Sequence, residues 1–254
     1  MINTAIILAG GLGTRLRSAV ADLPKCMAPV DGIPFISFII TYLKNEGIGN
    51  FIFSLGYKSE VVIDYVEFNY PDLQKKYVVE QKQLGTGGAI KEACKSVKEN
   101  DVVVVNGDTM FNINLRKLSQ FHSSKKADCT IALKEMENFE RYGVVETGNN
   151  SEITAFKEKQ FCIKGCINGG IYALSVAGLN DEIFPEVFSF EKEYLEKNTR
   201  LKKIHSIVDP GYFIDIGIPE DYQLFKNKYQ SIKLQNSLVG TGHSVEQFLK
   251  ELNK

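Results

Sequence analysis

Residues 8–16 read Leu-Ala-Gly-Gly-Leu-Gly-Thr-Arg-Leu and follow directly on the apolar run Ala5-Ile6-Ile7-Leu8. A short apolar run of this kind is typical of a buried strand. Glycines at the end of the strand let backbone N–H groups approach an anion closely, and successive N–H groups in such a turn form a concave anion site. The sequence therefore predicts a first strand that leads into a loop able to bind a polyphosphate.

Two common glycine-rich motifs do not fit this loop. A P-loop requires Gly-Lys-Ser/Thr after four free positions, but Arg15 stands five residues after Gly10 and is followed by Leu16. A dinucleotide fingerprint that begins at Gly11 finds Gly13 but meets Leu16 in place of its third glycine. Both motifs are excluded.

The loop is followed closely by Leu23-Pro24-Lys25-Cys26-Met27-Ala28-Pro29-Val30. Together the two segments resemble the signature of the sugar-phosphate nucleotidyltransferases, which join a nucleoside triphosphate to a sugar 1-phosphate and release pyrophosphate. The resemblance implies that the loop covers the triphosphate and that Arg15 and Lys25 bind its phosphates. The alternative is a solvated turn with two surface cations. On the resemblance, the first nucleotide-binding residues are Leu8, Ala9, Gly10, Gly11, Gly13, Thr14, Arg15 and Lys25.

Composition limits the classes of partner. The 254 residues are 44% hydrophobic, enough for a sizeable core, and 30 Lys and Arg against 31 Asp and Glu give a net charge of −1. No general attraction to nucleic acid or to an anionic membrane follows from this balance. The sequence shows no secretory signal and no apolar stretch of about 20 residues, so we expect a cytoplasmic protein. Five scattered cysteines suit reduced thiols.

Apolar runs alternate with helical patterns in the first half of the chain. Runs at 51–55, 77–79 and 102–105 read as strands, whereas 34–46 and 59–68 have helical spacing. This alternation predicts an α/β fold with a parallel sheet and crossover helices. The resemblance implies the nucleotide-diphosphosugar transferase fold, a Rossmann-like mixed, mainly parallel sheet flanked by helices, with a smaller antiparallel sugar-binding part.

We expect one catalytic domain over residues 1–230. Its nucleotide half spans about 1–134 and its sugar-phosphate half about 135–230, where short strands and turns replace the earlier alternation. Residues 231–254 form a C-terminal extension with a short amphipathic helix, introduced by a capping box at Ser244. The apolar stripe of this helix packs on its own body or on a partner subunit, which makes a homodimer plausible.

A second glycine-rich segment, Glu80 to Ala89, contains Leu-Gly-Thr-Gly-Gly-Ala. It resembles the family motif that flanks the nucleobase, most closely in guanylyltransferases, which implies GTP as the nucleotide and contacts from Gly85, Thr86 and Gly87. A carboxylate at Glu80 would accept hydrogen bonds from the N1–H and N2–H groups of guanine. The alternative is that Glu80 faces solvent at the end of a strand.

Two aspartates match the metal-binding positions of the family. Asp108 follows the apolar strand 102–105, and ligands bind at the carboxyl ends of strands in open α/β sheets. Asp215 lies in Phe213-Ile214-Asp215-Ile216-Gly217-Ile218-Pro219-Glu220-Asp221, which resembles the closing motif of the family. The resemblance implies that both acids hold Mg²⁺, a hard ion that prefers carboxylate and phosphate oxygens. Asp108 could instead be a turn or helix N-cap residue, and we expect Glu220 and Asp221 to be structural.

The sugar-phosphate site is expected in the second half of the chain. The resemblance assigns sugar-phosphate contacts to Tyr142, Gly143, Glu158, Lys159 and Asn168, with Lys159 holding the phosphate. Gln160 stands where the family usually has proline, and Lys157 lies close to Lys159, so the register of this assignment is open. A solvated charge run is the alternative.

The resemblance implies direct in-line attack by the sugar 1-phosphate on the α-phosphorus of the nucleotide, with Arg15, Lys25, Asp108, Lys159 and Asp215 as catalytic residues. It is greatest to guanylyltransferases that act on heptose 1-phosphate and supply GDP-heptose for bacterial surface polysaccharide. A mannose 1-phosphate guanylyltransferase and a uridylyltransferase are the nearest alternatives. A glycosyltransferase of similar fold would be expected to carry Asp-x-Asp, but the chain has Asp-Thr-Met from Asp108, and a non-catalytic nucleotide-sugar sensor would have lost Lys25, Asp108 or Asp215.

Overall fold

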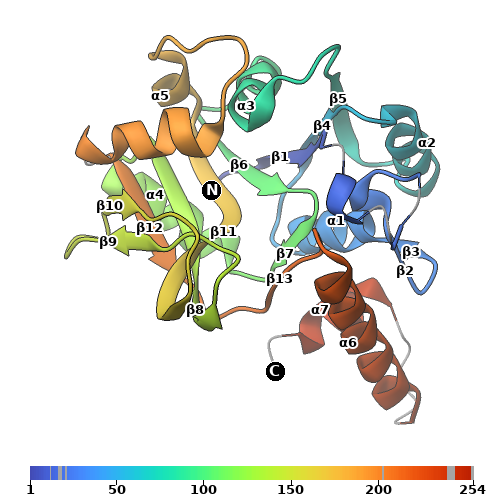
Figure 1. The fold of residues 1–254 in the computed structure, drawn as a ribbon. Coiled ribbons are helices and arrows are strands. Elements are labelled where there is room, and N and C mark those ends of the chain that lie inside the picture. Colours follow the sequence, from blue (N-terminus) through green and yellow to red (C-terminus); the bar gives the residue numbers. More distant parts are fainter. Residues whose placement is uncertain (12, 17–18, 21, 202, 239–243, 253–254) are drawn as a thin grey trace.

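The computed structural model describes residues 1–254 except 12, 17–18, 21, 202, 239–243 and 253–254. Its centre is a seven-stranded sheet in the order β12-β8-β11-β6-β1-β4-β5 (Figure 1). The strands are β1 (Thr4–Ala9), β4 (Asn50–Leu55), β5 (Gln74–Val79), β6 (Asp101–Asn106), β8 (Cys129–Phe139), β11 (Cys162–Ser175) and β12 (Ile204–Val208). Strand β11 runs antiparallel to both β6 and β8, and the other pairs are parallel. The expected mixed, mainly parallel sheet is confirmed.

Helices cover both faces of this sheet. They are α1 (Phe35–Asn45), α2 (Ser59–Asn69), α3 (Gly85–Cys94), α4 (Leu115–Lys125), α5 (Val176–Asn180), α6 (Pro219–Leu238), α7 (Val245–Glu251), the π-helix η3 (Phe190–Glu196) and the short 3₁₀ helices η1 (Thr14–Leu16), η2 (Lys25–Met27) and η4 (Thr199–Leu201). Helix α4 begins where the Asn114 side chain accepts a hydrogen bond from Lys117 N–H, a typical N-cap. Among the described residues, no helix combines the length and the apolar character needed to cross a membrane.

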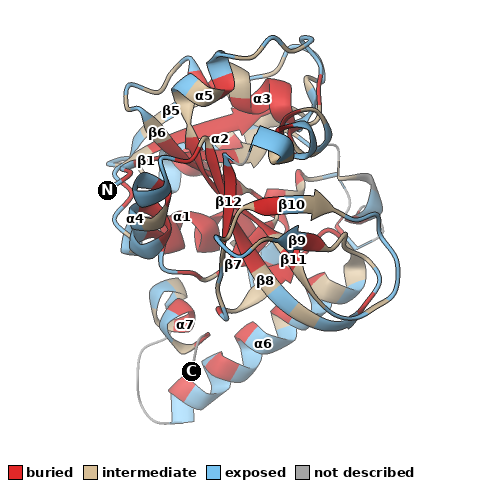
Figure 2. Cartoon of the chain, turned by 90° about the vertical axis from the view of Figure 1, so that its left-hand side faces the viewer, coloured by how far each residue is buried: buried red, intermediate tan, exposed pale blue. Residues whose placement is uncertain are grey.

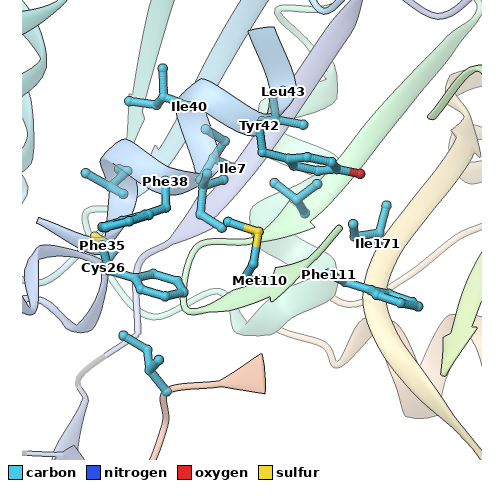
Figure 3. Packing of buried hydrophobic residues seen from close by; sticks show 14 of the residues in the cluster. Ile7, Cys26, Phe35, Phe38, Ile40, Tyr42, Leu43, Met110, Phe111 and Ile171 are labelled. Carbon is cyan, nitrogen blue, oxygen red and sulfur yellow. The ribbon is translucent and has the colours of Figure 1, made fainter. Parts of the chain in front are cut away.

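The alternation of side chains along each strand divides the core into two clusters, one on each face of the sheet. Ile7 belongs to the cluster formed with α1, α2, α4, α6 and α7, whereas its neighbour Ile6 belongs to the cluster formed with α3, α5 and η3. Figure 2 shows the strands buried between exposed outer helix faces. In Figure 3, Phe35 and Phe38 from α1 pack near Ile7 and Met110 in the first cluster. Burial on both faces explains why the parallel strands read as continuous apolar runs.

In the described part of the chain, three two-stranded antiparallel sheets lie outside the main sheet. They pair β2 (Pro29–Val30) with β3 (Ile33–Pro34), β9 (Val145–Thr147) with β10 (Ile153–Phe156), and β7 (Thr109–Phe111) with β13 (Phe213–Asp215). The predicted antiparallel part of the second half is therefore present, but β8, β11 and β12 belong to the main sheet together with the strands of the first half.

The two C-terminal helices pack on the body of their own chain. Helix α6 continues through residue 230, so its secondary structure does not break where the extension was expected to begin. The ring of Phe248 in α7 lies with its centroid 5.6 Å from that of Phe38 and 5.0 Å from that of Tyr229. The first of the two expected placements is therefore observed, and because the apolar stripe is covered by its own chain it gives no support to a homodimer.

Candidate active site

The glycine-rich loop brings the backbone against a lysine. Strand β1 ends at Ala9, and the loop then leads into η1 and, further on, η2, which begins with Lys25. Gly13 has a φ of +63°, and a Cβ on it would lie 2.9 Å from Cγ of Lys25. Glycine tolerates both the left-handed backbone and this close approach. The side chain of Thr14 lies outside the described part of the chain.

Asp108 and Asp215 are brought together by the β7–β13 pair. Asp108 directly precedes β7, and Asp215 at the end of β13 is paired in register with Thr109. The backbone N–H of Ile216 donates to the carbonyl of Asp108 at 3.0 Å, which fastens the two acidic residues to each other through the main chain. Two aspartates that are far apart in sequence therefore lie at adjacent positions of one ribbon.

Lys25 forms an ion pair with one of these two aspartates. Its Nζ lies 3.1 Å from Oδ2 of Asp108, and the side chains of Lys25 and Asp108 are 18% and 27% exposed. Burial, and then the negative charge of Asp108, raise the pKa of Asp215, while a hydrogen bond from Gly217 N–H and the positive charges of Lys25 and Arg141 lower it. The carboxylates thus repel each other, and a further cation between them would relieve that repulsion.

This donor set fits Mg²⁺. Magnesium is usually bound in proteins by one or two carboxylates, with phosphate oxygens and water as the remaining ligands. Asp108 and Asp215 supply the carboxylates, and Asp215 retains 24% exposure of its side chain. In the described part of the chain, no group of three or more His, Cys, Asp or Glu side chains could hold a metal ion, so the two aspartates alone would leave the other positions to phosphate oxygens or water.

Two cavities meet at Asp108. The first, here called the loop cavity, has a volume of about 440 Å³, and the second, the charged cavity, about 760 Å³. Asn106, Asp108 and Glu191 line both. The predicted residues that line the loop cavity are Leu8, Gly10, Gly11, Glu80, Gly85 and Thr86. Those that line the charged cavity are Arg15, Lys25, Tyr142, Gly143, Glu158, Lys159, Asn168 and Asp215. Residues from both halves of the chain are thus brought to one continuous site.

Three predicted residues, Ala9, Gly13 and Gly87, are not among the described residues that line these cavities. Gly87 is buried in α3, and its N–H donates to the carbonyl of Phe188 at 2.9 Å. A Cβ on Gly87 would collide with the ring of Phe188. Gly87 is therefore required for packing, because the lack of a side chain lets the segment before η3 lie directly against α3.

Glu80 lies on the wall of the loop cavity. Its Oε2 accepts a hydrogen bond from Leu84 N–H at 3.1 Å, and its Oε1 lies 2.7 Å from where a Cβ on Gly10 would stand. Burial raises the pKa of Glu80, and the bond from Leu84 partly offsets this. The side chain is thus held between the two glycine-rich segments rather than pointing freely into solvent.

The expected sugar-phosphate segments lie side by side around the charged cavity. Lys157 N–H donates to the carbonyl of Val144 at 2.8 Å, which places 157–159 next to Tyr142 and Gly143. Nζ of Lys157 is paired with Glu146 Oε1 at 3.3 Å. Asn168 lies at a register irregularity of β11, where its Oδ1 accepts from Gly170 N–H at 2.9 Å and its Nδ2 donates to Tyr172 Oη at 2.9 Å.

Sequence reasoning missed Arg141. It donates a hydrogen bond to Asp221, its guanidinium lies 3.9 Å from Oδ2 of Asp215, and its Cζ lies 5.4 Å from the centroid of the Tyr142 ring. Arg141 precedes the Tyr-Gly pair that carried the resemblance, and only this adjacency could have drawn attention to it. Asp221, expected to be structural at the start of α6, also orients a cation in the charged cavity.

Comparisons with known proteins find relatives over most of the chain. The family model described as nucleotidyl transferase matches residues 4–231. The chain is 49% identical to a D-glycero-alpha-D-manno-heptose 1-phosphate guanylyltransferase from Aneurinibacillus thermoaerophilus, over 89% of this chain and 98% of the relative. It is 47% identical to the protein of the same name from Campylobacter jejuni, over 87% of this chain and 97% of that relative.

The fold of the chain is similar to that of solved structures. The crystal structure of HddC from Yersinia pseudotuberculosis superposes with a TM-score of 0.80 at 36% identity and covers 90% of this chain and 100% of that one. The same protein complexed with GMP-PN gives a TM-score of 0.79 at the same identity and coverage. The match of the family model to most of the chain, together with these relatives, shows that the chain belongs to the nucleotidyl transferase family.

Proposed function

We propose that this enzyme joins GTP and D-glycero-α-D-manno-heptose 1-phosphate to give GDP-heptose and pyrophosphate. Two relatives that bear this activity in their names are 49% and 47% identical to the chain over nearly their whole length. The structurally similar HddC has been solved with GMP-PN. These likenesses support a guanine nucleotide and a heptose phosphate as the substrates.

One observation carries the proposal: the loop cavity and the charged cavity meet at Asp108, beside Lys25. A reaction between two anionic substrates needs two binding sites that open onto one point where charge is neutralised. In the first site, the N–H groups of the glycine-rich loop suit the phosphates of a nucleotide, and Glu80 suits its base. Cations and hydroxyl-binding groups from the second half of the chain suit the other site to a sugar phosphate.

The reaction needs no nucleophile from the protein. An oxygen of the sugar 1-phosphate attacks the α-phosphorus, a new P–O bond forms, and the bond from this phosphorus to the oxygen that bridges to the β-phosphate breaks. Pyrophosphate leaves with the electron pair of that bond. Catalysis is therefore positioning and charge stabilisation. Arg15, Lys25 and the loop N–H groups hold the leaving pyrophosphate, and Lys159 holds the acceptor phosphate.

The two lysines near the acceptor site are not equivalent. Lys157 already forms an ion pair with Glu146. Lys159 forms no ion pair with any residue that the structure describes, so its charge is available to a phosphate. This difference favours Lys159 over Lys157, with Glu158 and Asn168 as acceptors and donors for sugar hydroxyls.

Asp108 and Asp215 would hold Mg²⁺. When bound, this ion supplies positive charge to the phosphate oxygens of the nucleotide. Lys25 contributes its own positive charge beside Asp108, and Arg141 does the same beside Asp215. These protein cations reduce the repulsion between the acids and the incoming phosphates whichever ligands complete the metal site.

Glu80 is the residue proposed to select guanine. One of its oxygens is used by Leu84 N–H, and its side chain lies at the wall of the loop cavity. An ionised carboxylate accepts hydrogen bonds and offers none, so it matches the N1–H and N2–H donors of guanine and opposes the carbonyl edge of uracil.

A pyrophosphate-release screen of four nucleoside triphosphates against a panel of sugar 1-phosphates tests the proposal. We expect the fastest release with GTP and D-glycero-α-D-manno-heptose 1-phosphate, with GDP-heptose identified by mass spectrometry. Fast release only with mannose 1-phosphate or with UTP would refute the proposed substrates. The absence of release with every pair would refute the reaction itself.

A further inference from the structure

Glu191 stands between the two substrate cavities. It is the second residue of η3, and it lines both the loop cavity and the charged cavity together with Asn106 and Asp108. Its negative charge also contributes, after burial, to the raised pKa of Tyr172, which lines the charged cavity. The carboxylate is therefore placed where parts of both substrates would meet.

Two hydroxyl groups hold one oxygen of this carboxylate. Thr86 Oγ1 and Ser189 Oγ both donate to Glu191 Oε2, at 2.8 and 3.0 Å. The lone pairs of the same hydroxyls accept from the backbone N–H groups of Phe190 and Lys192, at 2.9 and 3.2 Å. Each hydroxyl has one hydrogen, so both hydrogens are committed to Oε2, which must act as an acceptor.

The other oxygen, Oε1, accepts no hydrogen bond from any residue that the structure describes, and no described cation forms an ion pair with Glu191. The carboxylate is thus fixed in direction without being neutralised. A side chain that served only to fasten η3 to α3 would need just the one oxygen. The second oxygen is left as an acceptor toward the cavities.

The chemistry of this acceptor limits what it can bind. An ionised carboxylate repels the phosphates of both substrates, and the described residues contain no cluster in which it could join other acids around a metal ion. The groups of a nucleotide and a sugar phosphate that donate hydrogen bonds near the phosphates are the hydroxyls of their sugar rings. A carboxylate oxygen accepts these well.

We propose that Glu191 is a specificity-determining residue that accepts a hydrogen bond from a hydroxyl of a substrate sugar ring, and that Thr86 and Ser189 are positioning residues that fix its direction. The ring is either the ribose of the nucleotide or the ring of the sugar 1-phosphate. This inference rests on the proposed function. It gives Thr86, expected to contact the nucleotide itself, an indirect role.

The substitution Glu191→Gln tests the inference because the hydrogen-bond directions determine how the amide must sit. Toward residue 191 the hydroxyls of Thr86 and Ser189 act as donors, so the amide carbonyl takes the place of Oε2 and the NH₂ group takes the place of Oε1. The variant keeps the local packing but replaces the charged acceptor by a neutral donor, so the substrate hydroxyl can form only a reversed, neutral hydrogen bond, which is weaker. Asp181→Asn is a matched loss of charge on an exposed residue that lines neither cavity.

Two measurements identify which sugar ring carries the hydroxyl. Isothermal titration calorimetry compares the binding of GTP, 2′-deoxyGTP and 3′-deoxyGTP, and pyrophosphate-release kinetics at varied heptose 1-phosphate concentration give the KM for that substrate. If the hydroxyl belongs to the ribose, the wild type binds one deoxy analogue about tenfold to a hundredfold more weakly than GTP, and Glu191→Gln narrows this difference to about tenfold or less. If it belongs to the sugar phosphate, GTP affinity is unchanged in Glu191→Gln and the KM for heptose 1-phosphate rises by about threefold to tenfold. Asp181→Asn should match the wild type.

Thr86→Val and Thr86→Ser supply a second test. Valine removes the hydroxyl and should weaken binding of the same substrate that Glu191→Gln affects, with a smaller change in kcat. Serine keeps the hydroxyl and should give the wild-type binding constant or KM. Unchanged KM and binding constants in both Glu191→Gln and Thr86→Val would overturn the inference while wild-type turnover still supported the proposed function. Absence of pyrophosphate release by the wild type would overturn the proposed function, and this inference with it.

Discussion

The substitution Phe248→Ala in α7 should destabilise the protein strongly without impairing the site. The Phe248 side chain is 0% exposed, and its ring centroid lies 5.6 Å from those of Phe38 and Phe225 and 5.0 Å from that of Tyr229. Replacing a buried phenylalanine by alanine removes this burial and leaves a cavity, at a cost of about 3–5 kcal/mol. For a chain of this size that corresponds to a decrease in Tm of roughly 6–20 °C.

Urea denaturation followed by circular dichroism, together with calorimetry, measures the effect. Leu238→Ala in α6 is the control, since that side chain is 87% exposed and should change the free energy of unfolding by less than about 0.5 kcal/mol. Pyrophosphate release at 25 °C should persist in Phe248→Ala, because no described residue of α7 lines either cavity. A loss below about 1 kcal/mol would refute the argument that α7 belongs to the core.

Three further predictions concern the site. Lys25→Ala and Asp108→Ala should each lower kcat by at least about 10²-fold while calorimetry shows a similar Tm, because they remove charge stabilisation rather than packing; near-normal pyrophosphate release would contradict their roles. Asp221→Asn should lower kcat/KM by roughly tenfold, because it loosens Arg141 beside Asp215; steady-state kinetics equal to the wild type would show that this pair only fastens α6. Removal of divalent ions by EDTA should stop pyrophosphate release and Mg²⁺ should restore it, whereas full activity in EDTA would argue against a metal.

The parallel half of the fold could be predicted from the sequence because its strands are buried on both faces. Runs such as 51–55 and 102–105 therefore read as strands, and the helices between them have clear apolar stripes. Strand β12 was missed, since Ile204–Val208 is short and lies at the edge of the sheet. Strand β8 continues to Phe139, across the boundary expected between the two halves at about residue 134, because its outer part pairs with β11 although many of its residues are exposed.

The predicted site residues came from motifs, and the structure brings most of them to the two cavities. A motif does not show which side chains from other parts of the sequence contact a residue in the folded protein. Arg141 reads as one more charge in an exposed stretch until Asp221 and Asp215 are placed around it. Glu191 reads as part of a charged helix until Thr86, more than 100 positions earlier, is seen to hold it.

The β7–β13 ribbon has a consequence for the folding of this enzyme. Asp108 is synthesised well before Asp215, and the two acids meet only when β13 docks on β7. Since successive side chains of a strand point to opposite faces, a docking that slips by one residue would direct Asp215 away from Asp108. A chain in which β13 has not docked thus lacks half of the carboxylate pair, so the proposed metal site is complete only once this segment has found its register.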